Sequence, residues 1–165
     1  MESNYQQRTD LLTQRVLLEA YLTTLQLDKA YNLLSKDNID IASLLDELAK
    51  AKRNISEDQE EDYNKVLDKV IKLFNLSGDV EEYIKQLGKL KNIDRNSRTA
   101  RIDGCDALIG MMKCNVNIKI KYAYVNQFLT TLSMNEDAYK KNETLFKNIL
   151  KEYEIYLEEQ DKDVN

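Results

Sequence analysis

The chain has no proline and only four glycines in 165 residues. Proline costs about 3 kcal/mol in the interior of a helix, and glycine is the usual residue of tight turns. A chain that lacks the first and has few of the second contains little that interrupts a helix. We therefore predict an all-α fold, and a length of 165 residues is typical of a single domain with its own core.

Apolar periodicity divides this domain, residues 1–165, into a bundle of five to six helices. Three of them are predicted to begin at capping boxes, which are formed by Ser56 with Gln59, Asp79 with Glu82, and Ser133 with Glu136. The acidic end, residues 158–165, is expected to fray. The predicted helical ranges are about 7–34 with a break near 26–28, 39–53, 56–74, 79–91, 97–132, and one from 133 onwards.

The range 97–132 is predicted to be one long central helix that packs subunits together. A 3-4-4 spacing of apolar residues supports this helix. Residues 116–125 also alternate between apolar and polar positions, which is typical of a strand. A strand that pairs between subunits therefore remains an open alternative. In the helical interpretation the oligomer interface consists of Ile109, Met112, Val116, Ile120 and Tyr124.

Charge is unevenly distributed along the chain. The net charge is −5, yet residues 85–121 hold nine of the 24 basic residues and only three acids. Charge separated in this way concerns what a surface meets more than how a chain folds. The pattern indicates a local contact with an anionic partner, either DNA or an acidic protein surface.

Enzymatic chemistry finds little support in the residues. The chain has no histidine, which is the commonest general base and a frequent metal ligand. No glycine-rich phosphate loop occurs, and the acids of residues 57–62 lack the spacing of a calcium loop. Cys105 and Cys114 lie nine residues apart and are expected to be free, partly buried thiols. We predict a protein that is not an enzyme and has no cofactor and no metal.

The first ten residues and the hydropathy of the chain indicate where in the cell the protein is expected. Residues 1–10 are polar and have no basic segment followed by an apolar one, so they do not form a signal peptide. No apolar run approaches the ~20 residues of a membrane span. The sequence predicts a soluble, cytoplasmic protein with no membrane partner, located in the host cytoplasm if it is viral.

Two groups of cations are candidates for phosphate contacts. Arg95, Arg98 and Arg101 are spaced by three, so on a helix they would lie along one face. Lys50, Lys52 and Arg53 end the helix predicted at 39–53. In addition, Tyr122 and Tyr124 stand beside Lys119 and Lys121, where their rings could stack on bases.

The segment 14–48 resembles the helix-turn-helix of phage terminase small subunits. The match consists of Leu18-Glu19-Ala20-Tyr21, then Asp28-Lys29-Ala30, then the helix Ile39–Leu48. The turn at 35–38 has no glycine, and the helix that would read DNA carries three acids, Asp40, Asp46 and Glu47. An ordinary helical hairpin is the alternative for this segment.

The resemblance implies a helix-turn-helix-like subregion at 14–53, a central helical region that forms oligomers, ring assembly, and delivery of viral DNA to a separate packaging ATPase. Our first hypothesis is accordingly a non-enzymatic subunit for DNA recognition and assembly. The second is a helical protein–protein adaptor or inhibitor with no nucleic-acid role, whose affinity comes from apolar anchors. A metal-dependent hydrolase that uses carboxylates alone is a third class and lacks a recognisable motif.

Overall fold

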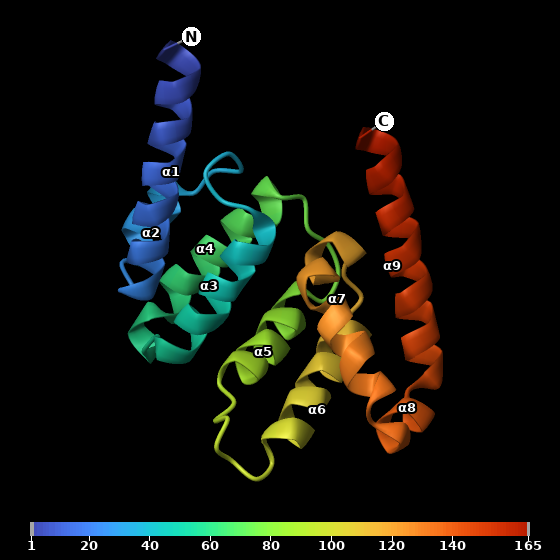
Figure 1. Cartoon of the computed structure of the whole chain (residues 1–165). Helices are drawn as coiled ribbons and strands as arrows, with labels where there is room; N and C mark the ends of the chain where they lie inside the picture. The colour runs from blue at the N-terminus through green and yellow to red at the C-terminus, as the bar shows by residue number, and fades with distance from the viewer. Residues whose placement is uncertain (1, 165) are drawn as a thin grey trace. The chain divides into compact units, whose positions relative to one another are not determined.

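The computed structural model describes residues 2–164, with side chains described for residues 8–162. Over this range the chain is all-helical, with no strands (Figure 1). It divides into two compact units, the first ending at Leu76 and the second starting at Ser77. The first unit contains α1 (Glu2–Thr23), α2 (Leu27–Leu33), α3 (Ile41–Asn54), a 3-10 turn η1 (Glu57–Gln59) and α4 (Glu60–Leu73). The second contains α5 (Val80–Lys91), α6 (Ala100–Lys113), α7 (Ile118–Ser133), α8 (Glu136–Lys141) and α9 (Glu143–Val164).

The core of the first unit is formed by α1 packing on α2 and α3, and by α2 packing on α4. The buried Tyr63 hydroxyl donates to the Leu48 carbonyl at 2.9 Å, so α4 is also tied to α3. This bond satisfies a polar group that lies within the core. The buried apolar residues of the helices include Leu18, Leu22, Leu27, Ala30, Leu44, Leu45, Leu48, Val66, Leu67 and Val70.

The break predicted near residues 26–28 lies at residues 24–26, between α1 and α2. Leu25 adopts a φ of 59°, in the left-handed region that ends helices. The N–H of Gln26 then donates back to the Tyr21 carbonyl at 2.8 Å. A local backbone reversal therefore turns one predicted helix into two.

In the second unit, α5 and α6 form an antiparallel hairpin, α7 packs on α6, and α9 packs on α7 (Figure 1). The start of α5 and the end of α6 are joined by two hydrogen bonds. The N–H of Asn115 donates to Asp79 Oδ2 at 2.9 Å, and the N–H of Asp79 donates to the Asn115 carbonyl at 3.2 Å. This pair fixes the register of the hairpin at one end.

The predicted single helix at 97–132 is wrong, because residues 114–117 separate α6 from α7. Asn117 caps α7, with its side chain accepting from the Lys119 N–H at 2.9 Å. The buried Lys121 ammonium donates to the Met112 carbonyl at 3.0 Å and so satisfies an end group of α6. Cys114 and Val116 are buried within the link. Because buried apolar residues continue through this link, the sequence pattern gives no sign of the break between α6 and α7.

The number of helices and their starting points differ in part from the sequence predictions. The described residues form nine α-helices, more than the five to six predicted, and the strand alternative at 116–125 is wrong because α7 begins at Ile118. The capping box at Ser56 is present, with the Ser56 N–H donating to Gln59 Oε1 at 3.1 Å. At Asp79 the side chain instead accepts from Asn115. After α7, Asn135 caps a separate short helix in place of Ser133.

The segment 158–165, predicted to fray, is helical as far as Val164, and Asn165 lies outside the described residues. The chain clusters into the two units described above. Whether the two units form one domain is not settled by this clustering, so the single domain stays a prediction. Within residues 2–164, no helix combines the length and the apolar character needed to cross a membrane.

Gly78 has a backbone conformation and a close neighbour that alanine would not tolerate. Its φ is +88°, and a Cβ placed on it would lie 1.7 Å from the Asn115 carbonyl oxygen. Gly78→Ala should therefore lower the free energy of unfolding by about 2–4 kcal/mol. Urea denaturation followed by circular dichroism measures this change.

Gly104→Ala is the matched control, since its added Cβ meets only Ile93 Cδ1 at 3.6 Å, an ordinary contact. Alanine within a helix should leave stability unchanged or raise it by up to about 1 kcal/mol. Equal effects of the two substitutions would contradict the described junction.

Lys121 generates the second prediction. Replacing it by Met removes the donor to the buried Met112 carbonyl and should cost about 1–3 kcal/mol. Burial lowers the pKa of Lys121 below 10.5, the effect being partly offset by Glu152, Cys114 and Asp79. The unfolded chain therefore holds this proton more tightly than the folded one. Wild-type stability relative to Lys121→Met should rise as the pH approaches 10.5.

Urea titrations of both proteins over a pH series measure the difference. Lys119→Met, at the exposed neighbouring lysine, is the control and should change stability by less than about 0.5 kcal/mol. A difference between wild type and Lys121→Met that stays flat or falls with pH would rule out a buried Lys121 ammonium.

Candidate nucleic-acid interface

The three predicted arginines lie at the turn of the α5–α6 hairpin. Arg95 and Arg98 are in the link between the helices and Arg101 is in the first turn of α6. Arg98, which falls inside the helix predicted to start at residue 97, therefore lies before α6, and the three arginines do not form a row along one helix. All three side chains are exposed. We call residues 92–101 the arginine loop.

The acids nearest these arginines are engaged elsewhere. Asp94 Oδ1 accepts from the N–H of Asn96 at 2.9 Å, and Asp103 Oδ2 accepts from the Thr99 hydroxyl at 2.8 Å. Among the residues whose side chains are described, no carboxylate lies within 4.0 Å of the three guanidinium groups. Three charged groups with five N–H donors each therefore face solvent.

The second predicted group, at the end of α3, is more strongly engaged. The Lys50 ammonium lies 3.6 Å from Glu47 Oε1, and the Lys52 ammonium lies 5.1 Å from the centre of the Tyr63 ring. Arg53 is exposed in the last turn of the same helix. Cations at this position also offset the negative end of the helix dipole. These contacts favour a structural role for Lys50 and Lys52.

The segment that resembles a helix-turn-helix lacks an open reading surface. A recognition helix presents its N-terminal residues to base edges, but Ile41, Ala42 and Ser43 are half-buried. Asp40 caps α3 by accepting from the Ser43 N–H at 3.2 Å and lies 3.3 Å from Arg15. The first turn of α3 is therefore occupied by contacts within the first unit.

The protonation of Asp40 fits this capping role. Partial burial acts to raise the pKa of Asp40, but the hydrogen bonds from Ser43 and the nearby Arg15 outweigh it, so the pKa lies below its usual value. The carboxylate is consequently charged at neutral pH. Its charge serves the helix start and is unfavourable next to phosphate.

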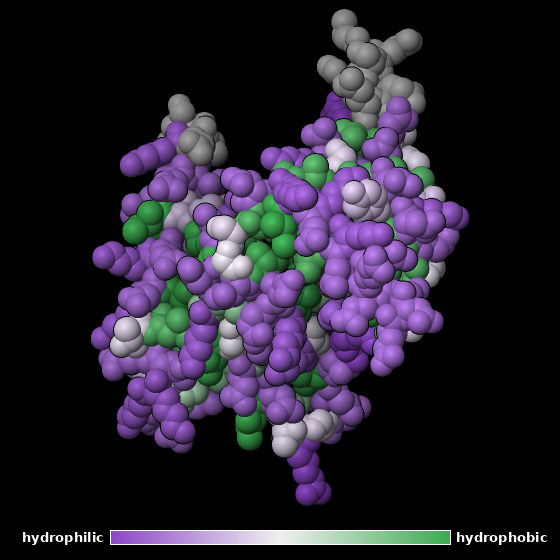
Figure 2. Space-filling view, turned by 180° about the vertical axis from the view of Figure 1, so that it is seen from behind, coloured by the Kyte–Doolittle hydropathy of each residue, from purple (hydrophilic) through white to green (hydrophobic). Residues whose placement is uncertain are grey.

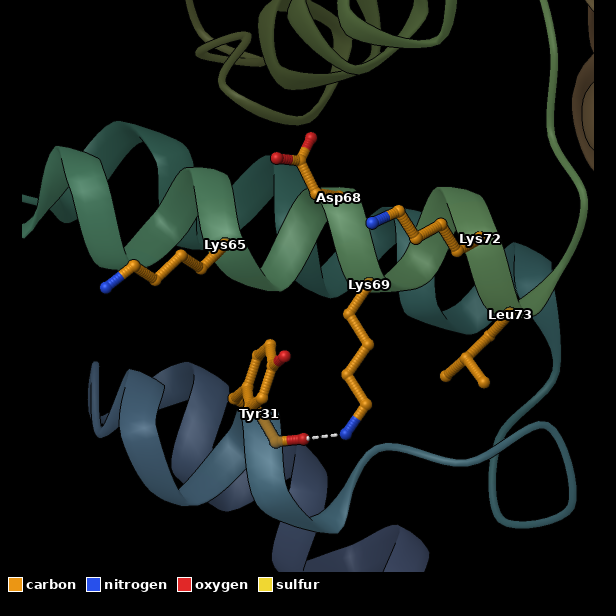
Figure 3. Close-up of a pocket in the computed structure, with 6 residues that line it drawn as sticks. All are labelled: Tyr31, Lys65, Asp68, Lys69, Lys72 and Leu73. Atoms are coloured by element: carbon orange, nitrogen blue, oxygen red, sulfur yellow. Dashed lines mark hydrogen bonds between the residues drawn. The ribbon is translucent and has the colours of Figure 1, made fainter.

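A groove between α2 and α4 was not predicted from the sequence (Figure 3). It has a volume of about 380 Å³ and is lined by Tyr31, Lys65, Asp68, Lys69, Lys72 and Leu73. Three lysines at positions i, i+4 and i+7 of α4 lie on one face of the helix. Their spacing was the signal in the sequence, but it looks the same as that of any solvated helix face.

Lys69 has a structural role in this groove. Its ammonium donates to the Tyr31 carbonyl near the end of α2 and lies 4.3 Å from the centre of the Tyr31 ring. This contact satisfies one of the end carbonyls of α2 and covers one face of the ring. The groove is therefore less open to an anionic or aromatic ligand than its three lysines suggest.

The tyrosine and lysine residues of α7 are also largely engaged. Lys121 is buried, so the proposed base-stacking group of Lys119, Lys121, Tyr122 and Tyr124 does not form as predicted. The Tyr122 ring packs against those of Tyr153 and Tyr156, with centroids 5.5 and 5.0 Å apart. Lys91 lies over the Tyr124 ring at 5.4 Å.

The residues predicted to form the oligomer interface lie mostly in the core. Met112, Val116 and Ile120 are buried, and Ile109 and Tyr124 are half-buried. Side chains that are already covered within one chain offer little apolar surface to a second copy. The assignment of these five residues to an oligomer interface stays a prediction.

Both cysteines are free and buried, as predicted. Burial raises the pKa of the Cys105 thiol, and Asp106 adds to this effect. Burial, followed by Asp79 and Glu82, raises the pKa of Cys114 to about 11. No group of three or more His, Cys, Asp or Glu side chains that could hold a metal ion occurs among the described residues.

Comparison of the chain with protein-family models, with curated proteins and with solved structures finds no match.

The cysteines generate the third prediction. The thiolate is the reactive form, and a rise in pKa from 9.0 to about 11 lowers its amount at pH 8. Cys114 should therefore react with iodoacetamide about a hundredfold more slowly in the folded chain than in urea. Mass spectrometry of the peptides follows each site separately. Equal rates in the folded and unfolded chains would contradict the burial of this thiol.

Proposed function

We propose that this chain is a non-enzymatic DNA-binding and assembly subunit that contacts phosphates through the arginine loop. The observation that carries the proposal is the set of three exposed guanidinium groups, Arg95, Arg98 and Arg101, whose neighbouring acids are already hydrogen-bonded. Guanidinium groups match phosphate oxygens in geometry and remain charged at all physiological pH values.

The overall charge limits how DNA is bound. A net charge of −5 repels a polyanion from most of the surface, so the proposed contact is confined to the arginine loop of the second unit. Arg53, exposed in the first unit, stays a separate candidate. Since the first turn of α3 is occupied, binding rests on the phosphate backbone and has little base specificity. Delivery of DNA to a packaging ATPase is part of the proposal and rests on the terminase resemblance alone.

An adaptor that binds an acidic protein is the second candidate, and one observation favours it. Ile102 is 61% exposed immediately after Arg101. An exposed aliphatic side chain beside cations is typical of a protein interface, where it acts as an anchor, whereas phosphates make no use of it. Ile102 therefore separates the two functions experimentally.

The fourth prediction concerns charge reversal in the arginine loop. Replacing Arg95, Arg98 and Arg101 together by Glu should weaken binding to duplex DNA by at least about a hundredfold at low salt, because three phosphate contacts become repulsive. A gel-shift assay at low salt measures the loss. Ile102→Ala should bind DNA like wild type.

The control reverses three other exposed cations, Lys65, Lys140 and Lys147, each of which forms an i, i+4 ion pair. It changes the net charge by the same amount and should keep most of the binding. The DNA hypothesis fails if wild type does not shift DNA, or if the control loses binding as completely as the arginine variant.

A further inference from the structure

Ser97 carries an exposed hydroxyl group at the centre of the arginine loop. Three of the chain's six arginines lie within four residues of it, namely Arg95, Arg98 and Arg101. Hydrophilic residues project at the lower edge of Figure 2, where Figure 1 places the turn between α5 and α6. The hydroxyl is therefore open to solvent within a basic segment.

Two consecutive turns share Ser97. Its N–H donates to the Asp94 carbonyl at 3.0 Å, and its carbonyl accepts from the Ala100 N–H at 3.3 Å. The first and last Cα atoms of such a turn lie within about 7 Å of each other. Arg95 is inside the first turn and Arg98 is inside the second, so both side chains start close to Ser97. A phosphate group on Ser97 would thus lie within reach of two guanidinium groups, which bind phosphate with paired N–H donors.

Thr99 is the other hydroxyl residue of the loop, and its contacts differ from those of Ser97. The Thr99 hydroxyl has one proton, which it donates to Asp103 Oδ2 at 2.8 Å. In the 3.1 Å contact between the two hydroxyl groups, Ser97 is therefore the donor. A phosphate on Thr99 would be repelled by the Asp103 carboxylate. Ser97 Oγ contacts the hydroxyl and the N–H of Thr99, and no carboxylate among the described residues.

We propose that Ser97 is a phosphorylation site and that its phosphate closes the arginine loop to DNA. The phosphate donor is ATP, used by a protein kinase of the class that selects serines flanked by arginine. Ser97 Oγ attacks the γ-phosphorus, and the new P–O bond forms as the bond to ADP breaks. The hydroxyl proton passes to the catalytic aspartate of the kinase. The DNA part of this inference rests on the proposed function, whereas the pairing of phosphate with arginine does not.

The charge of the loop decides the effect of the phosphate. Residues 92–101 contain three arginines and one acid, Asp94, so their net charge is +2. A phosphoserine adds about −1.5 to −2 at pH 7, which leaves the loop nearly neutral. The guanidinium groups then pair with this phosphate in place of DNA phosphates. DNA affinity at low salt should fall by at least about tenfold.

Incubation of the full chain with ATP, Mg²⁺ and the catalytic domain of an arginine-directed serine/threonine kinase tests the acceptor. Mass spectrometry of the peptides should locate most of the phosphate on Ser97. Ser97→Ala should lose most of the incorporation, and Thr99→Ala, the matched control, should keep it. No incorporation, or phosphate mainly on Thr99 or outside the loop, overturns the proposal.

The effect on DNA is measured with a full chain in which phosphoserine is incorporated at Ser97 during synthesis, so that no kinase is needed. Fluorescence anisotropy with duplex DNA at low salt should show the expected loss of affinity relative to the unmodified chain. Treatment with a phosphatase should restore the affinity. Equal affinities of the phosphorylated and unmodified chains overturn the closure of the loop.

A ³¹P NMR titration of the same phosphorylated chain tests the pairing without DNA. Guanidinium groups favour the doubly charged phosphate, so the second pKa of the phosphoserine should lie below that in a chain that also carries Arg95→Gln and Arg98→Gln. An equal pKa in the two chains rejects the pairing. If the unmodified chain binds no DNA while this pKa is lowered, the proposed function fails and the pairing stands. If DNA is bound and phosphoserine changes neither the affinity nor the pKa, this inference fails alone.

Discussion

The arrangement of the second unit depends on the contact between the start of α5 and the link after α6. Gly78 has no Cβ, so the Asn115 carbonyl can approach its backbone, and Asp79 then exchanges two hydrogen bonds with Asn115. Because α5 and α6 are antiparallel, fixing this end of the hairpin sets the opposite end, where the arginine loop projects. The exposed cations of the loop therefore lie at the end of the hairpin opposite this contact.

The charges of the chain fall into two classes. Many make contacts within the fold. Asp40 caps α3, and Asp94 accepts a hydrogen bond in the turn after α5. Lys69 donates to a carbonyl near the end of α2, and Lys121 donates to one near the end of α6. The arginines of the loop have no such use within the described residues. This is the ground on which we propose that an anionic partner meets the loop. The chain's net charge of −5 would keep such a contact local.

Sequence patterns predicted the helical class, α3, α4 and the capping box at Ser56, because these depend on residues close together in the chain. They did not predict the break at 114–117. The break is held by Asp79, which is distant in sequence, and by the bond from Lys121 to the Met112 carbonyl, and residues 114–117 contain no recognisable turn signal. Lys121 looked like a surface cation and is a buried donor. The arginine residues were found from the charge distribution along the sequence. The sequence did not show that the acids beside them, Asp94 and Asp103, accept hydrogen bonds from Asn96 and Thr99.

The proposed contact of the three loop arginines with phosphates is tested most directly by the salt dependence of the DNA-binding constant. Fluorescence anisotropy measures it for wild type and for the triple variant Arg95→Gln, Arg98→Gln, Arg101→Gln. Each phosphate contact contributes about −0.9 to the slope of log K against log salt for duplex DNA. If all three arginines meet phosphates, the slope becomes shallower by about 2 to 3 in the variant. An unchanged slope would show that these residues do not meet phosphates.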